Sequence, residues 1–123
     1  MAKKILVVED EEIMFNLLKR RLEREGYEVY IAEDGEKGLN MMKEVGPDLI
    51  LLDIIMPKLG GLEVMEKMNE DNSLKSIPVI VISNSGQPVE IDKAQKLGAR
   101  DWLVKANFDL QEIVDKVNNQ LGG

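Results

Sequence analysis

Five polar side chains follow apolar stretches of this chain, and together they could carry chemistry. Glu9 and Asp10 come directly after the first apolar run, Asp53 after the central one, Ser83 after the next and Lys105 after the last. If these runs are parallel strands of one sheet, all five side chains project from one edge, where open α/β sheets bind their ligands. Three carboxylates crowded there repel one another, and a hard divalent cation such as Mg²⁺ relieves that repulsion.

With such a cation in place, the charge at this edge no longer excludes a phosphate group. Asp53 could then act as a nucleophile and form an acyl phosphate. Lys105 would neutralise one phosphoryl oxygen, and the Ser83 hydroxyl would donate a hydrogen bond to another. Each residue also has an ordinary structural explanation, since acids suit a helix start and serine suits a strand end. Their joint occurrence at the ends of different strands favours the chemical interpretation.

The composition excludes several other kinds of chemistry. The 123 residues include no cysteine and no histidine, which rules out disulfides, thiolate chemistry, histidine-ligated metals and Ser-His-Asp catalysis. The 16 basic and 23 acidic side chains give a formal net charge of −7, which disfavours direct binding of nucleic acid. No apolar run approaches the ~20 residues of a membrane span, and the first run is too short for a secretory signal. We therefore expect a cytoplasmic protein without a membrane partner.

The positioning elements can be read from the apolar periodicity. Asp34 and Asp109 are placed to cap helices, and Gly26 is placed to close the first one. The apolar stripe of that first helix is predicted to hold Ile13, Met14, Leu17, Leu18 and Leu22. The predicted strands cover residues 4–8, 27–32, 49–52, 77–82 and 101–104, and each is followed by a helix.

Strands that alternate with helices predict a parallel sheet, because a parallel connection needs a crossover. We therefore expect one α/β domain over residues 1–123, a doubly wound (βα)5 unit with helices on both faces. The fourth helix, residues 88–97, is mostly polar and is expected to be shallowly packed and mobile.

The signature positions recur in a known pattern: Glu9-Asp10, Asp53-x-x-Met56-Pro57, Ser83 and Lys105. Over essentially the whole chain this pattern resembles the receiver domain of two-component response regulators, most closely the stand-alone receivers of the chemotaxis-regulator type. The resemblance implies a flavodoxin-like sheet with strand order 2-1-3-4-5. It also implies a phosphoacceptor regulator rather than an enzyme acting on an outside substrate.

The resemblance assigns roles at the acidic end of the pattern. Asp53 would accept phosphate from a histidine kinase or phosphotransfer protein, in a transfer that the domain itself catalyses with Mg²⁺. Asp10, Asp53 and the main-chain carbonyl of Ile55 would ligate the Mg²⁺, with Glu9 acting nearby or through water. Because Ile55 offers no polar group to orient a water, although Asn84 could, slow self-dephosphorylation is expected.

The resemblance also implies a two-state switch. Phosphorylation would draw Ser83 inward, and Trp102, at the family's aromatic switch position, would shift into the vacated space. The surface formed by the fourth helix, the fifth strand and the last helix would then change its affinity for a target protein. A monomer or weak dimer is expected.

Two positions depart from the family pattern. Gly60-Gly61 stands where the family commonly has Asp-Gly, which affects the start of the third helix. Ala106 stands where the family usually has a cis-proline. A cis peptide before a non-proline residue costs about 2.5–4 kcal/mol, so the Lys105–Ala106 peptide is either trans, or cis under strain.

Three rival functions stay open, and so does the question whether the chain is a whole protein or part of a larger one. A flavin electron carrier needs a glycine- and hydroxyl-rich phosphate loop after the first strand, where this chain has Glu9 to Glu12. An aspartyl-phosphate hydrolase needs a second acid two residues after Asp53, where this chain has Ile55. A receiver-like module that binds partners without phosphorylation is the most serious rival. The chain is either a stand-alone regulator or a receiver domain excised from a larger protein.

Overall fold

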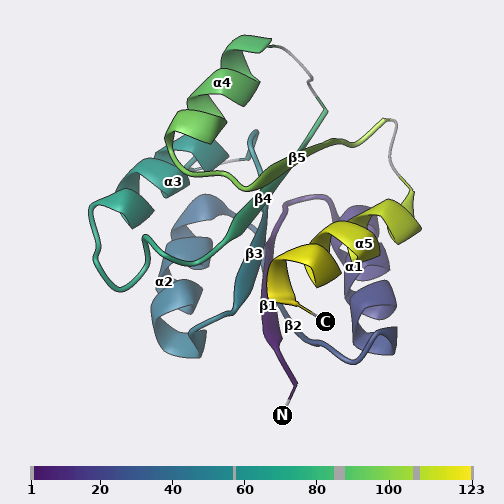
Figure 1. Cartoon of the computed structure of the whole chain (residues 1–123). Coiled ribbons are helices and arrows are strands. Elements are labelled where there is room, and N and C mark those ends of the chain that lie inside the picture. The colour runs from purple at the N-terminus through teal and green to yellow at the C-terminus, as the bar shows by residue number, and fades with distance from the viewer. Residues whose placement is uncertain (1, 57, 85–87, 107–108, 123) are drawn as a thin grey trace.

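A computed structural model gives the fold (Figure 1), and it describes residues 2–56, 58–84, 88–106 and 109–122. Strands and helices alternate along the chain. Their bounds are β1 Lys4–Val8, α1 Glu12–Arg24, β2 Glu28–Ala32, α2 Gly35–Val45, β3 Leu49–Asp53, α3 Gly61–Asn69, β4 Val79–Ser83, α4 Pro88–Lys96, β5 Asp101–Val104 and α5 Leu110–Leu121. Among the described residues, no helix combines the length and the apolar character that crossing a membrane requires.

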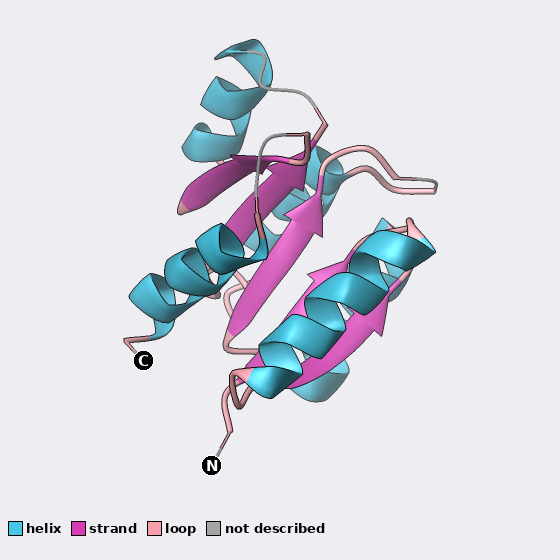
Figure 2. Cartoon of the chain, turned by 90° about the vertical axis from the view of Figure 1, so that its right-hand side faces the viewer, coloured by secondary structure: helices cyan, strands magenta, loops and turns pink. Residues whose placement is uncertain are grey.

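The five strands form one parallel sheet in the order β2-β1-β3-β4-β5, as the strand order implied by the resemblance requires. Figure 2 shows the strands side by side, with helices in front of and behind them. β3 lies in the middle of the sheet, and all five of its residues are buried. Parallel pairing brings the carboxyl ends of β1, β3, β4 and β5 to the same edge of the sheet.

Alternating side chains of the sheet contribute to two separate cores. Leu6 and Val8 of β1 pack into the first core, whereas Ile5 and Val7 pack into the second. The first core is completed by buried residues of α2, α3 and α4, and the second by those of α1 and α5. Figure 1 shows these two groups of helices on opposite sides of the sheet.

The predicted helix caps are confirmed. The Asp34 carboxylate accepts a 2.8 Å hydrogen bond from the Lys37 N–H at the start of α2. Asp109 accepts one of the same length from the Glu112 N–H at the start of α5. Gly26 follows α1 with φ of 95°, the left-handed conformation typical of a residue that ends a helix.

The predicted apolar stripe of α1 is wrong in part. Leu18 and Leu22 are buried, but the side chain of Ile13 is 80% exposed and that of Leu17 is 43% exposed. Successive helical residues are about 100° apart, so Leu17 points well away from the line on which Leu18 contacts the sheet. The apolar periodicity predicts a stripe wide enough to hold both positions, whereas the buried face of α1 is narrower.

Three strands also differ from their predicted ranges, and the third strand extends one residue further, to Asp53. The second strand begins at Glu28, one residue later than predicted, and the fourth covers Val79–Ser83 rather than residues 77–82. The Ile77 N–H donates to the Leu74 carbonyl, which keeps Ile77 in the preceding turn. In α4 only Ala94 belongs to the buried core, among the side chains the structure describes. The predicted mobility of this helix stays a prediction.

Candidate functional site

The sheet register brings the predicted site residues to one edge. Asp53 is the last residue of β3 and pairs with Ile82, one residue before Ser83 at the end of β4. Ser83 in turn pairs with Val104, the residue before Lys105. Glu9 continues β1, and its N–H donates a 3.0 Å hydrogen bond to the Ala32 carbonyl at the end of β2. The edge is therefore assembled by main-chain pairing alone.

The ammonium group of Lys105 lies among three carboxylates. Its Nζ is 2.7 Å from Oε1 of Glu9, 2.7 Å from Oε1 of Glu11 and 3.1 Å from Oδ2 of Asp53. The side chains of Lys105, Glu9 and Asp53 are only 4%, 2% and 5% exposed, respectively. A lysine ammonium has three donors, and each of the three has a carboxylate partner here.

The carboxylates at this edge have the chemistry of a divalent-cation site. One oxygen from each of Glu9, Asp10 and Asp53 lies within 4.8 Å of the others. With Glu11, four acids lie at this edge beside the Lys105 ammonium, so three negative charges are left uncompensated when all are ionised. Oxygen ligands and an excess of negative charge fit Mg²⁺, which is bound through one or two carboxylates together with water.

Burial changes the pKa values of the buried acids. Desolvation raises the pKa of Glu9 to about 7, although its hydrogen bond to Lys105 works in the opposite direction. Desolvation likewise raises the pKa of Asp53, against the opposing effect of Lys105. Burial alone would lower the pKa of Lys105, but the hydrogen bonds to Glu11, Glu9 and Asp53 outweigh it and raise that pKa. The ammonium is therefore held in its charged form.

The start of α3 packs closely against the backbone of Asp53 and Ile54. The Gly61 N–H donates a 2.7 Å hydrogen bond to the Ile54 carbonyl. A Cβ atom added to Gly61 would lie 2.3 Å from the Asp53 carbonyl oxygen, a distance that no side chain tolerates. At Gly60 the corresponding Cβ would lie 3.2 Å from the Ile54 carbonyl, which is tight but less severe. The second glycine of the Gly60-Gly61 pair is thus required by the close approach of α3 to the end of β3.

The residues predicted to tune phosphoryl lifetime lie on the solvent side of the site. The Ile55 side chain is 65% exposed, and its N–H donates to Oδ1 of Asp53 over 3.3 Å. Asn84 is exposed directly after β4. Ser83, by contrast, is completely buried. The roles predicted for these three residues, and for the Ile55 carbonyl as a metal ligand, stay predictions.

Trp102 lies on β5, half-buried against the first core. Its indole Nε1 is buried without a hydrogen-bond partner among the described residues. A buried donor without a partner is costly, so this rotamer is held by packing rather than by a polar contact. The Lys105–Ala106 peptide is trans, because no peptide bond between described residues is cis.

Glu11 is the site residue that the sequence reasoning missed. The sequence places it only within the acidic stretch Glu9 to Glu12, yet its carboxylate reaches Lys105 from a side chain that is 55% exposed. Its position directly after Glu9 and Asp10 was the available signal. Nothing in the spacing indicated that it, rather than Glu12, turns toward the lysine.

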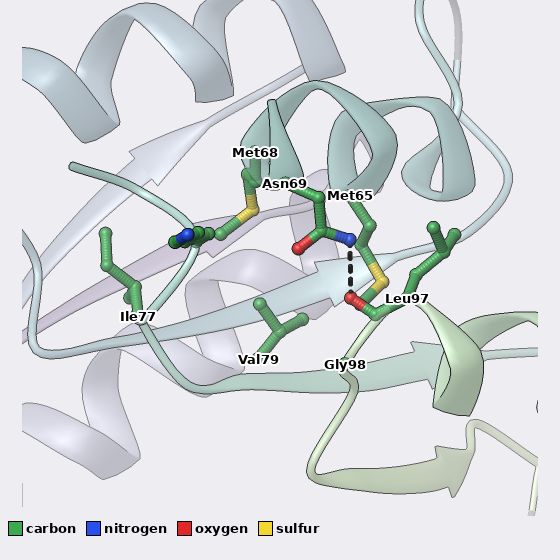
Figure 3. A pocket seen from close by; sticks show the side chains of 8 residues that line it. Met65, Met68, Asn69, Ile77, Val79, Leu97 and Gly98 are labelled. Atoms are coloured by element: carbon green, nitrogen blue, oxygen red, sulfur yellow. Dashed lines mark hydrogen bonds between the residues drawn. The ribbon is translucent and has the colours of Figure 1, made fainter. Parts of the chain in front are cut away.

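A small pocket lies away from this edge, between α3 and the turn that precedes β5 (Figure 3). It measures about 10 Å³, room for one water molecule, and Met65, Met68 and Val79 contribute to its lining. Beside it the Asn69 amide donates a 2.8 Å hydrogen bond to the Leu97 carbonyl, which joins the C-terminal ends of α3 and α4. This pocket is too small for a ligand and is not part of the carboxylate site.

Comparison with known proteins identifies the relatives of the chain. A sequence model described as the response regulator receiver domain matches residues 5–118. The alkaline phosphatase synthesis transcriptional regulatory protein PhoP of Bacillus subtilis is 39% identical over 117 residues, which make up 95% of this chain and 48% of that protein. The chain therefore spans about half the length of this curated relative.

Solved structures of response regulators superpose on nearly the whole chain. The chemotaxis protein CheY4 of Vibrio cholerae superposes with a TM-score of 0.90 at 25% identity, covering 97% of this chain and 98% of the other. A CheY-like response regulator receiver domain protein from Methanospirillum hungatei superposes with a TM-score of 0.91 at 26% identity, covering 99% and 95%.

Proposed function

The chain belongs to the response regulator receiver domain family of two-component signalling, and from this premise we propose that Asp53 is its phosphoacceptor. Receiver domains are phosphoacceptor regulators that interact with histidine kinases or phosphotransfer proteins and bind Mg²⁺ at an acidic pocket. The observation that carries the assignment of Asp53 is its position between Lys105, at 3.1 Å, and two further carboxylates at the same sheet edge.

The proposed reaction transfers one phosphoryl group from a phosphohistidine of the partner. A carboxylate oxygen of Asp53 forms a bond to phosphorus, and the bond between phosphorus and the imidazole nitrogen breaks, with its electron pair staying on the imidazole. Lys105 hydrogen-bonds a phosphoryl oxygen and balances the charge that Asp53 gains. The Ser83 hydroxyl hydrogen-bonds a second phosphoryl oxygen.

Asp10, Asp53 and the main-chain carbonyl of Ile55 would hold the Mg²⁺, with Glu9 contributing through water. When bound, the cation screens the carboxylates from the incoming phosphoryl oxygens. The uncompensated charge around Lys105 and the oxygen-only ligand set support this assignment.

The output surface of the proposed switch is formed by α4, β5 and α5. A downstream protein binds to this surface. Ser83 and Trp102 couple it to the site, because both lie on the adjacent strands β4 and β5. Because the Trp102 indole has no hydrogen-bond partner among the described residues, no polar contact with them has to break when the side chain changes position. The proposed donor kinase and a sequence without cysteine fit a cytoplasmic location.

The test is phosphorylation by acetyl phosphate with Mg²⁺, read by intact-protein mass spectrometry. Wild type should gain one phosphoryl group, and Asp53→Asn should gain none. Asp92→Asn is the matched control, because Asp92 is an exposed acid on α4 whose contact is an ion pair with Lys96. If wild type stays unmodified with this donor and with phosphorylated kinases, the chain is a binding module that works without phosphorylation.

A further inference from the structure

The contact between Glu11 and Lys105 is the feature of this site that the proposed reaction does not use. Glu11 is the residue before α1, and its side chain makes no capping hydrogen bond to that helix. Instead its carboxylate lies 2.7 Å from the Lys105 ammonium. Serine, threonine, aspartate and asparagine at this position ordinarily accept a hydrogen bond from a helix N–H group, and glutamate is not one of these residues.

All three donors of the Lys105 ammonium are occupied by carboxylates in this state. A phosphoryl oxygen on Asp53 therefore cannot be added to the ammonium; it has to replace one of the three partners. Asp53 itself carries the phosphoryl group, so it stays next to Lys105. Besides the Asp53 oxygen, whose charge is lost on phosphorylation, the partner that can leave is Glu9 or Glu11.

Burial and anchoring distinguish these two acids. Glu9 is 2% exposed, and its Oε2 accepts a 3.0 Å hydrogen bond from the Glu11 N–H, which fixes the carboxylate in place. The Glu11 side chain is 55% exposed and can move into water with little desolvation cost. The exposed acid is therefore the one that can be exchanged.

We propose that Glu11 is an internal competitor for the phosphoryl group: it occupies the donor of Lys105 that a phosphoryl oxygen takes, and its carboxylate moves into water when Asp53 is phosphorylated. This regulation rests on the proposed phosphoacceptor function of Asp53. Glu11 acts through Lys105 and is a positioning residue, not a catalytic one. Its competition lowers the affinity of the site for phosphoryl groups and keeps the unphosphorylated state favoured.

The test compares three variants that separate contact from charge. Glu11→Gln removes the charge and weakens the contact. Glu11→Asp keeps the charge but shortens the side chain by one methylene, and aspartate is a favourable residue to cap α1, so the carboxylate turns away from Lys105. Glu12→Gln removes the same charge from the neighbouring exposed residue and is the matched control.

Each protein is titrated with beryllofluoride in saturating Mg²⁺, with binding followed by amide NMR. Glu11→Gln and Glu11→Asp should bind about fivefold more tightly than wild type, the size expected from one partly exposed ion pair. Glu12→Gln should stay within about twofold of wild type. Equal affinities of Glu11→Gln and Glu12→Gln, or wild-type affinity in Glu11→Asp, would overturn the proposal.

A second readout uses the metal-free protein and no phosphoryl group. The Nζ signal of Lys105, protected by three carboxylates in wild type, should exchange faster with water in both Glu11 variants and stay unchanged in Glu12→Gln. An unchanged exchange rate of the Lys105 Nζ protons in the Glu11 variants would overturn the proposal that Glu11 competes for this lysine. Failure of wild type to bind beryllofluoride at all overturns the phosphoacceptor function instead, and the competition with it.

Discussion

The main-chain N–H of Lys105 donates a 2.7 Å hydrogen bond to the carbonyl oxygen of Ser83. The two residues proposed to hold the phosphoryl group are therefore joined through their backbones as well as through adjacent strands. A displacement of the Ser83 segment toward the phosphate moves the segment that carries Lys105. Trp102 lies on β5, three residues before Lys105, so it is well placed to report such a displacement.

Trp102 fluorescence should change when the site is filled. Addition of beryllofluoride in the presence of Mg²⁺ should give a saturable change in wild type, because the only tryptophan of the chain lies on β5. Asp53→Asn should lose this change, because beryllofluoride binds the Asp53 carboxylate and the resulting adduct mimics an acyl phosphate. A response of equal size in the variant would show that the signal does not come from the phosphoacceptor.

Mg²⁺ should stabilise the fold. Binding to the folded state alone raises the free energy of unfolding by about 2.7 kcal/mol at a concentration 100-fold above the dissociation constant, or about 10 °C in melting temperature for a domain of this size. The measurement is thermal unfolding followed by circular dichroism, with and without a chelator. Asp10→Asn should abolish most of the shift, and Asp92→Asn should preserve it. If millimolar Mg²⁺ leaves the melting temperature of wild type unchanged, the metal site is ruled out.

Gly61→Ala should destabilise the protein by about 1–3 kcal/mol, because the new Cβ has to displace the Asp53 carbonyl or shift α3. Gly60→Ala is the matched control, since its Cβ meets a carbonyl at 3.2 Å rather than 2.3 Å. The control should change stability by less than about 1 kcal/mol. Urea unfolding measures both. Equal losses in the two variants would contradict the required close approach at Gly61.

Ile55→Asn should speed self-dephosphorylation modestly, by about threefold to tenfold, because a polar group near the phosphate can orient the attacking water. The exposed Ile55 side chain can be replaced without opening the core. The decay of phosphorylated protein is followed by phosphate-affinity gels after removal of the donor. An unchanged or slower decay would mean that Asn84 or another group already controls the water.

The stability of the metal-free protein should fall as the pH rises from about 4.5 to about 7. The folded state binds the Glu9 proton more tightly than the unfolded state does, because burial raises the pKa of Glu9 from 4.5 to about 7. The unfolded state therefore loses its proton first, and the free energy of unfolding declines across this window. Glu9→Gln should have a flatter profile of melting temperature against pH. Parallel profiles in the two proteins would contradict the raised pKa.

The sequence alone predicts the sheet and its edge well, because those depend on local signals. The four apolar residues before Asp53 could only be a buried central strand, and Asp34 and Asp109 cap helices as their spacing predicts. The site lysine and its acids follow from topology, since parallel strands deliver their ends together.

Features that depend on tertiary orientation could not be predicted in the same way. Ile13 and Leu17 match the helical period as well as Leu18 does, and only the docking angle of α1 decides which of them is buried. Glu11 and Glu12 are identical residues side by side, and only the start of the helix decides which one contacts Lys105. The burial of the Trp102 indole, which has no hydrogen-bond partner in the described part of the chain, likewise depends on how β5 packs, and no local pattern predicts it.

The sheet separates two cores that share no side chain, with alternate residues of each strand assigned to one or the other. Mutations in the core beneath α4 therefore leave the packing of α1 and α5 intact. After gene duplication, copies of such a domain could therefore change the α4 part of the proposed output surface while the α5 part and the chemistry at the sheet edge are inherited unchanged.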